Sequence, residues 1–277
     1  MDTNAIRGAW EEARRIAAAA AQVVLPGWRS GAPVRKKGRI DLVTEYDLAA
    51  ESLVRRELAA SFPNHRIVAE EGAAEGEGEV VWYVDPLDGT TNFAHGHPLF
   101  SVSIALFDGA EGLVGVIAAP ALGVTWSAGK GLGAFRNDRP CHVSATATLS
   151  EALCATGFPY DKWTNPDHNV AELDAFLTRT HGVRRGGSAA LDLAMVADGT
   201  FDLYWEKQLS PWDMAAGAVL VQEAGGQLSD YDGSPGDPRT GRLVASNGRV
   251  HAAALDVLTE TRRTVPARAV KAPYDGR

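Results

Sequence analysis

The first half of the chain alternates between helical and strand patterns of hydrophobic residues. Residues 3–25 combine many alanines with spaced Arg and Glu residues, which predicts a helix ended by Pro26 and Gly27. A polar loop at 30–39 follows. The other predicted elements of this half are a strand over 41–43, a helix over 44–61, strands over 66–69 and 80–84, and an antiparallel meander over 99–136.

From about residue 150 the pattern changes to alternating helices and strands. We predict helices near 166–180, 188–198, 212–225 and 249–262, and strands near 153–156, 201–205 and 243–246. This order predicts an α/β (α+β) layered architecture, with an antiparallel first half to about residue 145 and a mixed second half. We expect one domain over residues 1–262 and a loose tail over 263–277.

Composition and charge narrow the possible partners. The chain has 277 residues, of which 45% are hydrophobic and 22% charged, with a formal net charge of −8. This charge argues against a nucleic-acid partner. Two cysteines without metal-ligand spacing indicate neither a disulfide framework nor a zinc site. The apolar stretch at 14–25 is too short to span a bilayer, so we expect a cytoplasmic protein without a membrane partner.

Acidic residues gather at the ends of predicted elements. The segment EVVWYVDPLDGTTNF (79–93) brings a hydrophobic strand to two aspartates with no Lys or Arg nearby. The acidic residues in such positions are Glu70, Glu71, Asp85, Asp88, Asp47 and Asp213. Each has a simple structural explanation when it is taken alone. Glu70 and Glu71 fit a solvated loop, Asp85 and Asp88 fit Asx-turns, and the pairs Thr44–Asp47 and Ser210–Asp213 fit helix capping boxes.

Taken together, these carboxylates predict a metal site. Burying several carboxylates without cations is unfavourable by several kcal/mol for each ion, as an order of magnitude. Mg²⁺ prefers a few carboxylates together with water and phosphate oxygens, and Asp85, Asp88 and the Leu87 carbonyl can converge on one point. Gly89 allows a sharp turn, and a helix opening at Thr90 would present free N–H groups to an anion. This arrangement is suited to phosphoryl transfer.

These blocks resemble the inositol monophosphatase family. DPLDGTTNF (85–93) and WDMAAGAVLVQEAGG (212–226) are similar to its two signatures. DLVTEYD (41–47), VAEEG (68–72) and RRGGSAALDLAMVADGTFDLYWE (184–206) are similar to three further blocks, in the same order. The resemblance covers about residues 5–260. It implies the αβαβα five-layered sandwich of the sugar phosphatases, Mg²⁺-dependent hydrolysis of phosphate monoesters, sensitivity to lithium and a homodimer.

The resemblance also assigns roles to individual residues. It implies that one Mg²⁺ is held by Glu70, Asp85 and the Leu87 carbonyl, a second by Asp85, Asp88 and Asp213, and a weaker third with help from Glu70, while Glu71 assists through water. The implied catalytic residues are Glu70, Thr90 and Asp47, with Thr90 orienting the attacking water and Asp47 behind it. The implied substrate-binding residues are Glu70, Leu87, Asp88, Gly89, Thr90, Gly187, Ser188, Ala189, Glu206 and Asp213. Among them, the amides of Gly89 and Thr90 bind phosphate, and Asp88, Ala189 and Glu206 meet substrate hydroxyls.

The expected function is that of an inositol-1-monophosphatase, which acts by direct in-line attack of a metal-activated water on a phosphorylated polyol. A carboxylate at Glu206 can also bind an amine, so histidinol phosphate is the main alternative substrate. Fructose 1,6-bisphosphate and 3′-phosphoadenosine 5′-phosphate are lesser alternatives. A different class, a metal-dependent binding module without turnover, is disfavoured by the pair Thr90 and Asp47, because a binder needs no hydroxyl that orients water.

Overall fold

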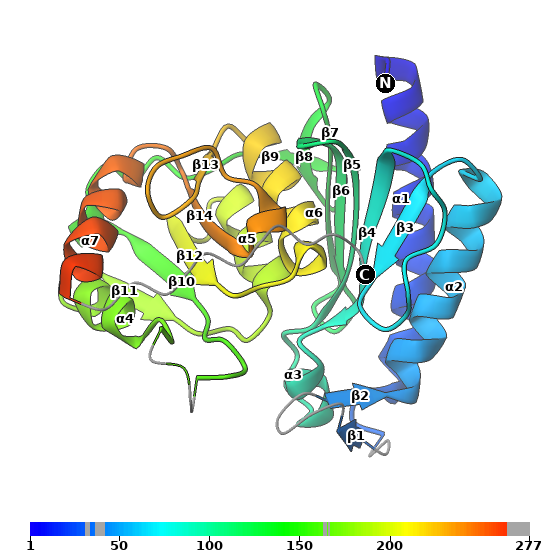
Figure 1. Ribbon diagram of the computed structural model, residues 1–277, viewed down its shortest axis with the longest axis horizontal. Helices are drawn as coiled ribbons and strands as arrows, with labels where there is room; N and C mark the ends of the chain where they lie inside the picture. Colours follow the sequence, from blue (N-terminus) through cyan, green and yellow to red (C-terminus); the bar gives the residue numbers. More distant parts are fainter. Residues whose placement is uncertain (31–33, 37–41, 163–164, 166, 265–277) are drawn as a thin grey trace.

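Two β-sheets are stacked between layers of helices in the computed structural model (Figure 1), which describes residues 1–30, 34–36, 42–162, 165 and 167–264. The larger sheet has seven strands in the order β3-β4-β5-β6-β7-β8-β9. Their bounds are β3 Arg66–Ala69, β4 Val80–Asp88, β5 Ser101–Asp108, β6 Glu111–Ala119, β7 Val124–Gly129, β8 Gly133–Arg136 and β9 Arg139–Cys141. Neighbours from β4 to β9 pair antiparallel, which confirms the predicted meander. The β3–β4 pair is parallel and is an exception to the antiparallel first half.

Helices cover both faces of this sheet. Helices α1 (Thr3–Val24) and α2 (Glu45–Ser61) pack on one face, where the buried stripe of α1 lies over β5 to β7 and α2 lies over β4. Helices α5 (Ala189–Ala197) and α6 (Pro211–Glu223) pack on the other face. Every residue of α6 from Met214 to Val221 is buried. This is the pattern expected of a helix that has a sheet on each side.

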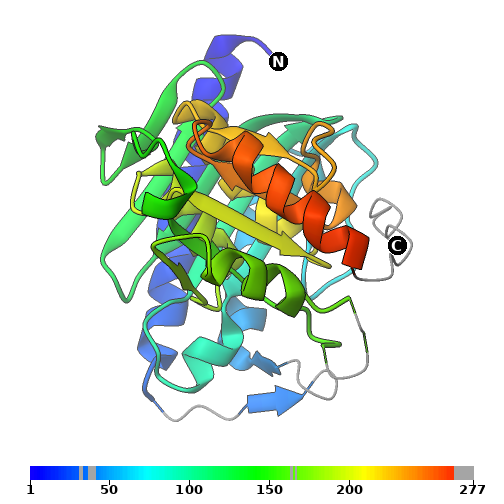
Figure 2. The same cartoon turned by 90° about the vertical axis from the view of Figure 1, so that its left-hand side faces the viewer.

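The second sheet lies on the far side of α5 and α6. Its strand order is β11-β10-β12-β14-β13. The bounds are β10 Leu153–Thr156, β11 Gly182–Arg184, β12 Leu203–Lys207, β13 Gln227–Ser229 and β14 Arg242–Ser246. Helices α4 (Val170–Leu177) and α7 (His251–Thr264) lie side by side over its outer face (Figure 2). The layers therefore run helix, sheet, helix, sheet, helix, which confirms the predicted αβαβα sandwich.

The remaining elements are short. They are β1 (Val34–Lys36) paired with β2 (Leu42–Thr44), helix α3 (Thr90–Ala94), and the single 3₁₀ turns Leu25–Gly27, Leu149–Glu151 and Pro238–Thr240. None of the helices in the described part of the chain has the length and apolar character needed to cross a bilayer.

Several predicted boundaries differ from the observed ones. Strand β1 lies inside the predicted polar loop at 30–39, and the three-residue strands β11 and β13 were not predicted. Such short strands have too few residues to show a periodic pattern. They form because they pair with neighbouring strands. Helix α7 continues to Thr264, so the predicted tail begins later than 263, and residues 265–277 lie outside the described residues. The boundary of the proposed single domain stays a prediction.

Candidate active site

A β-bulge points Asp85 and Asp88 in the same direction. Strand β4 continues through Asp88, where the sequence predicted a turn after Val84. Against β5, Asp85 lies opposite Ser103 and Asp88 lies opposite Ser101, so an advance of three residues on β4 matches two on β5. In a regular strand, residues three apart point to opposite faces. The extra residue restores a common direction for the two carboxylates.

The N-terminus of α6 adds a third carboxylate. Asp213 occupies the third helical position, and its Oδ2 accepts the backbone N–H of Ser210 at 2.7 Å, as the predicted capping box requires. One carboxylate oxygen each from Asp85, Asp88 and Asp213 lies within 4.8 Å of the others. Among the described residues, no Lys or Arg forms an ion pair with these three aspartates. We call Asp85, Asp88 and Asp213 the aspartate cluster.

The aspartate cluster is electrostatically strained without a cation. Burial raises the pKa of Asp85 well above its usual range, and the neighbouring carboxylates of Glu70, Asp88 and Asp213 raise it further. Burial raises the pKa of Asp88 to about 6, although a hydrogen bond from the Ser188 hydroxyl acts in the opposite direction. Burial likewise raises the pKa of Asp213, with Asp88 and Glu70 adding to the effect. A divalent cation would relieve all of these repulsions at once.

Glu70 and Glu71 lie at the end of β3, beside the aspartate cluster. The Glu70 N–H donates to the Val84 carbonyl at 3.2 Å, which holds Glu70 next to the strand that carries Asp85. Its carboxylate acts electrostatically on the cluster but is not part of the group within 4.8 Å. The Glu71 N–H donates to Oε2 of the buried Glu51 at 2.8 Å. Helix α2 therefore fixes the backbone of this predicted metal-binding turn.

Thr90 lies in contact with Asp47, as the sequence predicted. The Thr90 hydroxyl lies 3.2 Å from Asp47 Oδ1 and 3.0 Å from the Leu87 carbonyl oxygen. The other oxygen of Asp47 accepts the Thr44 N–H at 2.8 Å and closes the capping box of α2. Burial raises the pKa of Asp47, while its hydrogen bonds lower it. Asp47 thus caps a helix and also orients the Thr90 hydroxyl, two roles that the sequence offered as alternatives.

Gly89 makes the turn between β4 and α3. Its φ is +87°, a left-handed conformation that glycine adopts without strain. A Cβ at this position would lie 2.9 Å from the Leu99 carbonyl oxygen, so a side chain would also clash with backbone. Helix α3 begins at Thr90, as predicted, and its first N–H groups have no partner within the helix.

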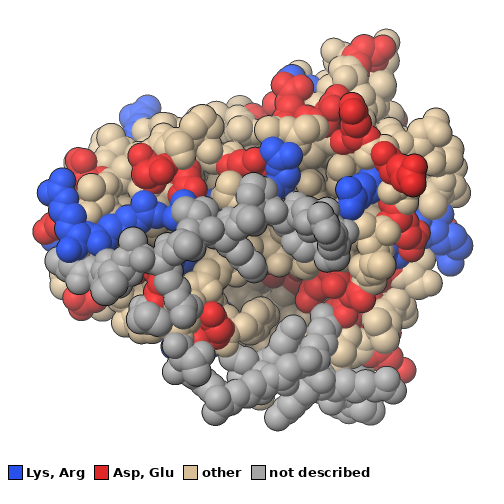
Figure 3. Space-filling view, viewed as in Figure 1, with Lys and Arg blue, Asp and Glu red and all other residues tan. Residues whose placement is uncertain are grey.

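A cavity opens beside the aspartate cluster. The sequence-predicted residues in its wall are Asp88, Gly187, Ser188, Ala189, Glu206 and Asp213. The loop from Gly157 to Tyr160 forms another part of the wall, together with Arg185 and Asp192. Asp47, Glu70, Asp85, Leu87, Gly89 and Thr90 are not in this wall. In the space-filling view, acidic side chains border a hollow on this face of the molecule (Figure 3).

Glu206 is buried in the cavity wall. Its Oε2 accepts the Tyr204 hydroxyl at 2.7 Å, and burial raises the pKa of Glu206 to about 7. A Cβ on Gly157 would lie 2.1 Å from either oxygen of this carboxylate, so the absence of a side chain there makes room for Glu206. Tyr204 was not predicted, although residues two apart on a strand point to the same face.

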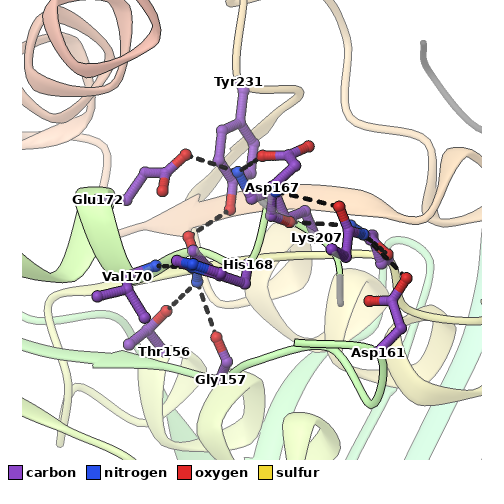
Figure 4. A network of polar contacts seen from close by, with 12 residues as sticks. Thr156, Gly157, Asp161, Asp167, His168, Val170, Glu172, Lys207 and Tyr231 are labelled. Atoms are coloured by element: carbon purple, nitrogen blue, oxygen red, sulfur yellow. Dashed lines mark hydrogen bonds and ion pairs between the residues drawn. The ribbon is translucent and has the colours of Figure 1, made fainter. Parts of the chain in front are cut away.

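A buried polar network joins Gly157 and the start of α4 to β12. The Lys207 ammonium, which is only 5% exposed, lies between the carboxylates of Asp167 and Glu172 (Figure 4). The Asn169 amide donates to Thr156 Oγ1 and to the Gly157 carbonyl, each at 2.8 Å. Lys207 directly follows Glu206 in the chain. The network therefore ties the Gly157–Tyr160 wall of the cavity to the strand that carries Glu206.

Comparisons with known proteins identify this arrangement. The model of the inositol monophosphatase family matches residues 9–265. The "Inositol-1-monophosphatase" of Synechocystis sp. is 44% identical over 254 residues, which cover 91% of this chain and 88% of that protein. The "Nus factor SuhB" of Pseudomonas aeruginosa is 43% identical over 231 residues, which cover 81% and 85%. The solved inositol monophosphatase of Anabaena sp. has a TM-score of 0.85 and 42% identity, and the alignment covers 94% of this chain and 97% of that chain.

The match extends over nearly the whole chain, and it agrees in fold as well as in sequence. The chain therefore belongs to the inositol monophosphatase family, and it is a phosphoric monoester hydrolase.

Proposed function

We propose that the protein hydrolyses inositol 1-phosphate, or a closely similar polyol monophosphate, with Mg²⁺ as its cofactor. The observation that carries this proposal is the shared cavity of Asp88, Asp213 and Glu206. It joins the aspartate cluster, in which Asp85 and Asp88 are buried and Asp213 is half-buried, to a buried carboxylate that can accept hydrogen bonds from hydroxyl groups. The polyol end of a substrate would meet Glu206, Ala189 and Ser188, while its phosphate would lie against the aspartate cluster.

The aspartate cluster fits Mg²⁺ by the chemistry of its donors. Three carboxylate oxygens within 4.8 Å of one another, with no described cation paired to them, suit a hard divalent ion. We infer that Glu70, Asp85 and the Leu87 carbonyl hold one ion, that Asp85, Asp88 and Asp213 hold a second, and that Glu70 contributes to a weaker third. When bound, Mg²⁺ supplies positive charge to the phosphate and leaving oxygens and lowers the pKa of water.

The Thr90 hydroxyl can orient the attacking water. Because this hydroxyl can donate its single hydrogen to Asp47 or to the Leu87 carbonyl, its oxygen keeps lone pairs that can accept a hydrogen bond from water. Water held in this way attacks phosphorus directly, in line with the leaving oxygen. The Ser188 hydroxyl and the Ala190 N–H, at 3.0 Å, both donate to Asp88 and fix its orientation.

Thr90→Val should lower kcat about 10–100-fold, the usual cost of removing a group that orients a metal-site ligand. Valine keeps the shape but cannot accept a hydrogen bond from water. Thr90→Ser keeps the hydroxyl and should retain most of the activity. Initial rates at saturating Mg²⁺ measure both variants. Wild-type kcat in Thr90→Val would exclude the proposed role.

Three alternative substrates have support in the cavity. Glu206 can pair with the ammonium group of histidinol phosphate. Arg185 lines the same wall and carries a positive charge that suits a second phosphate, as in fructose 1,6-bisphosphate. Phe158 and Tyr160 also line it, so the cavity has aromatic groups near a cation, which the nucleotide 3′-phosphoadenosine 5′-phosphate could use. The homodimer implied by the family stays a prediction.

A phosphate-release assay with a panel of substrates tests the proposal. The panel holds inositol 1-phosphate, glycerol 2-phosphate, histidinol phosphate, fructose 1,6-bisphosphate and 3′-phosphoadenosine 5′-phosphate, each with and without Mg²⁺. We expect Mg²⁺-dependent turnover with the highest kcat/KM for inositol 1-phosphate. A preference of more than tenfold for histidinol phosphate or a bisphosphate would replace the proposed substrate, and turnover that is independent of Mg²⁺ would remove the proposed cofactor.

A further inference from the structure

Asp192 is a buried carboxyl without a partner in the wall of the cavity. The residue is only 3% exposed, and it lines the same cavity as Glu206 and Asp88. Among the residues that the structure describes, none forms a hydrogen bond or an ion pair with its carboxyl group. Burying a polar group without a hydrogen bond is costly. Because this carboxyl faces the cavity, water or a hydroxyl group of a bound ligand can satisfy it.

The backbone around Asp192 places it on the cavity side of α5. Ser188 caps this helix, and its Oγ contacts Asp88 while accepting the Leu191 N–H at 3.3 Å. Asp192 lies about one helical turn after Ser188, and both residues line the cavity. The Asp192 N–H donates to the Ser188 carbonyl at 3.1 Å, which fixes the spacing of the two residues.

Gly186 makes room for the Asp192 carboxyl. A Cβ at Gly186 would lie 2.6 Å from Asp192 Oδ1. Gly157 leaves space for Glu206 in the same way. Each of the two carboxyls is therefore backed by a glycine, and both reach the same cavity. Burial raises the pKa of both groups, and each adds to the electrostatic environment of the cavity, with Arg185 acting in the opposite direction on both.

We propose that Asp192 is a further specificity-determining residue, which binds hydroxyl groups of the substrate's polyol together with Glu206. The inference rests on the proposed function and extends it to a residue outside those to which the family resemblance gives a role. A carboxyl group can accept a hydrogen bond from one hydroxyl, and in its protonated form it can also donate one. Two such groups in one wall favour a substrate with several hydroxyls over a monoester without them.

The test compares two substrates on three variants. Inositol 1-phosphate carries hydroxyls, whereas p-nitrophenyl phosphate has none near the ester. Asp192→Ala should raise KM for inositol 1-phosphate about tenfold with kcat little changed, and it should leave kcat/KM for p-nitrophenyl phosphate within twofold of wild type. Asp192→Asn keeps a hydrogen-bond acceptor, so its KM for inositol 1-phosphate should rise less than that of Asp192→Ala. The control is Asp174→Ala, which removes an exposed carboxylate in α4 and should leave kcat and KM for both substrates unchanged.

Thermal unfolding separates binding from a structural role. Because the Asp192 carboxyl makes no hydrogen bond with a described residue, its removal should leave the Tm equal or higher. Equal losses of kcat/KM for both substrates, or a fall in Tm that accompanies them, would overturn the proposal. If the wild-type enzyme hydrolyses p-nitrophenyl phosphate but not inositol 1-phosphate, the proposed substrate is wrong, and the role proposed for Asp192 is wrong with it. A selective effect on inositol 1-phosphate supports both.

Discussion

Asp88→Asn is expected to lower kcat on the order of 1000-fold while it leaves the fold intact. Removing one preorganised electrostatic group from an active site typically lowers kcat 10²–10³-fold. Asp88 has three roles in this site. It belongs to the aspartate cluster, it lines the substrate cavity, and it accepts hydrogen bonds from Ser188 and Ala190. An amide at this position loses the negative charge that holds a cation. Initial rates over a range of Mg²⁺ concentrations measure the loss.

A stability measurement makes this prediction sharper. Because Asp88 adds to the repulsion among buried carboxylates, the metal-free Asp88→Asn variant should unfold at the same temperature as wild type or higher at pH 7.5. The rise in Tm that Mg²⁺ gives to the wild type should shrink in the variant. Asp174→Asn, which neutralises an exposed carboxylate, is the matched control and should behave as wild type. Near wild-type turnover of Asp88→Asn at saturating Mg²⁺ would refute the assignment of the site.

Local patterns in the sequence were sufficient to predict the elements that carry the site. Helical starts at Thr44 and Ser210 could be recognised because a capping box needs only a few adjacent residues. The meander was predictable because alternation and turn residues are also local signals. Each of Asp47 and Asp213 proved to be a capping residue that also faces the site, so the structural and functional explanations were not exclusive.

What the sequence could not predict depends on pairing over long distances. The bulge that turns Asp85 and Asp88 the same way exists only against Ser101 and Ser103 of β5. The sequence analysis placed both aspartates in a turn because Pro86 and Gly89 are typical turn residues. Asp192 carried no signal of its own. Its significance appears only when α5 packs beside β12 and leaves its carboxyl in the same wall as Glu206.

The metal-free protein should become less stable as the pH rises from 5 to 7.5. The pKa of Asp88 is about 6 in the folded state and 3.8 without the fold, which corresponds to about 3 kcal/mol. Well below pH 3.8 the group is protonated in both states and costs nothing. As the pH rises, the unfolded chain loses this proton first, so folding becomes less favourable until the folded group also ionises above about pH 6. The raised pKa values of Asp85 and Asp213 act in the same direction.

Roughly half of the Asp88 penalty falls between pH 5 and pH 7.5, so the Tm in excess EDTA should drop by about 3 °C from this group alone. Mg²⁺ at 100 times its dissociation constant adds about 2.7 kcal/mol. Because Mg²⁺ competes with protons for the same oxygens, its stabilising effect should be larger at pH 7.5 than at pH 5.

Differential scanning fluorimetry at both pH values, with EDTA or with Mg²⁺, measures the Tm under all four conditions. The Asp88→Asn variant should show a flatter dependence on pH in EDTA, since it lacks one of the titrating groups. Two outcomes would contradict this prediction: a wild-type Tm in EDTA that rises between pH 5 and pH 7.5, or an effect of Mg²⁺ that is equal at both pH values. Either outcome would mean that the carboxylates at 85, 88 and 213 are not held close together without a cation. The metal site proposed for this chain would then lose its physical basis.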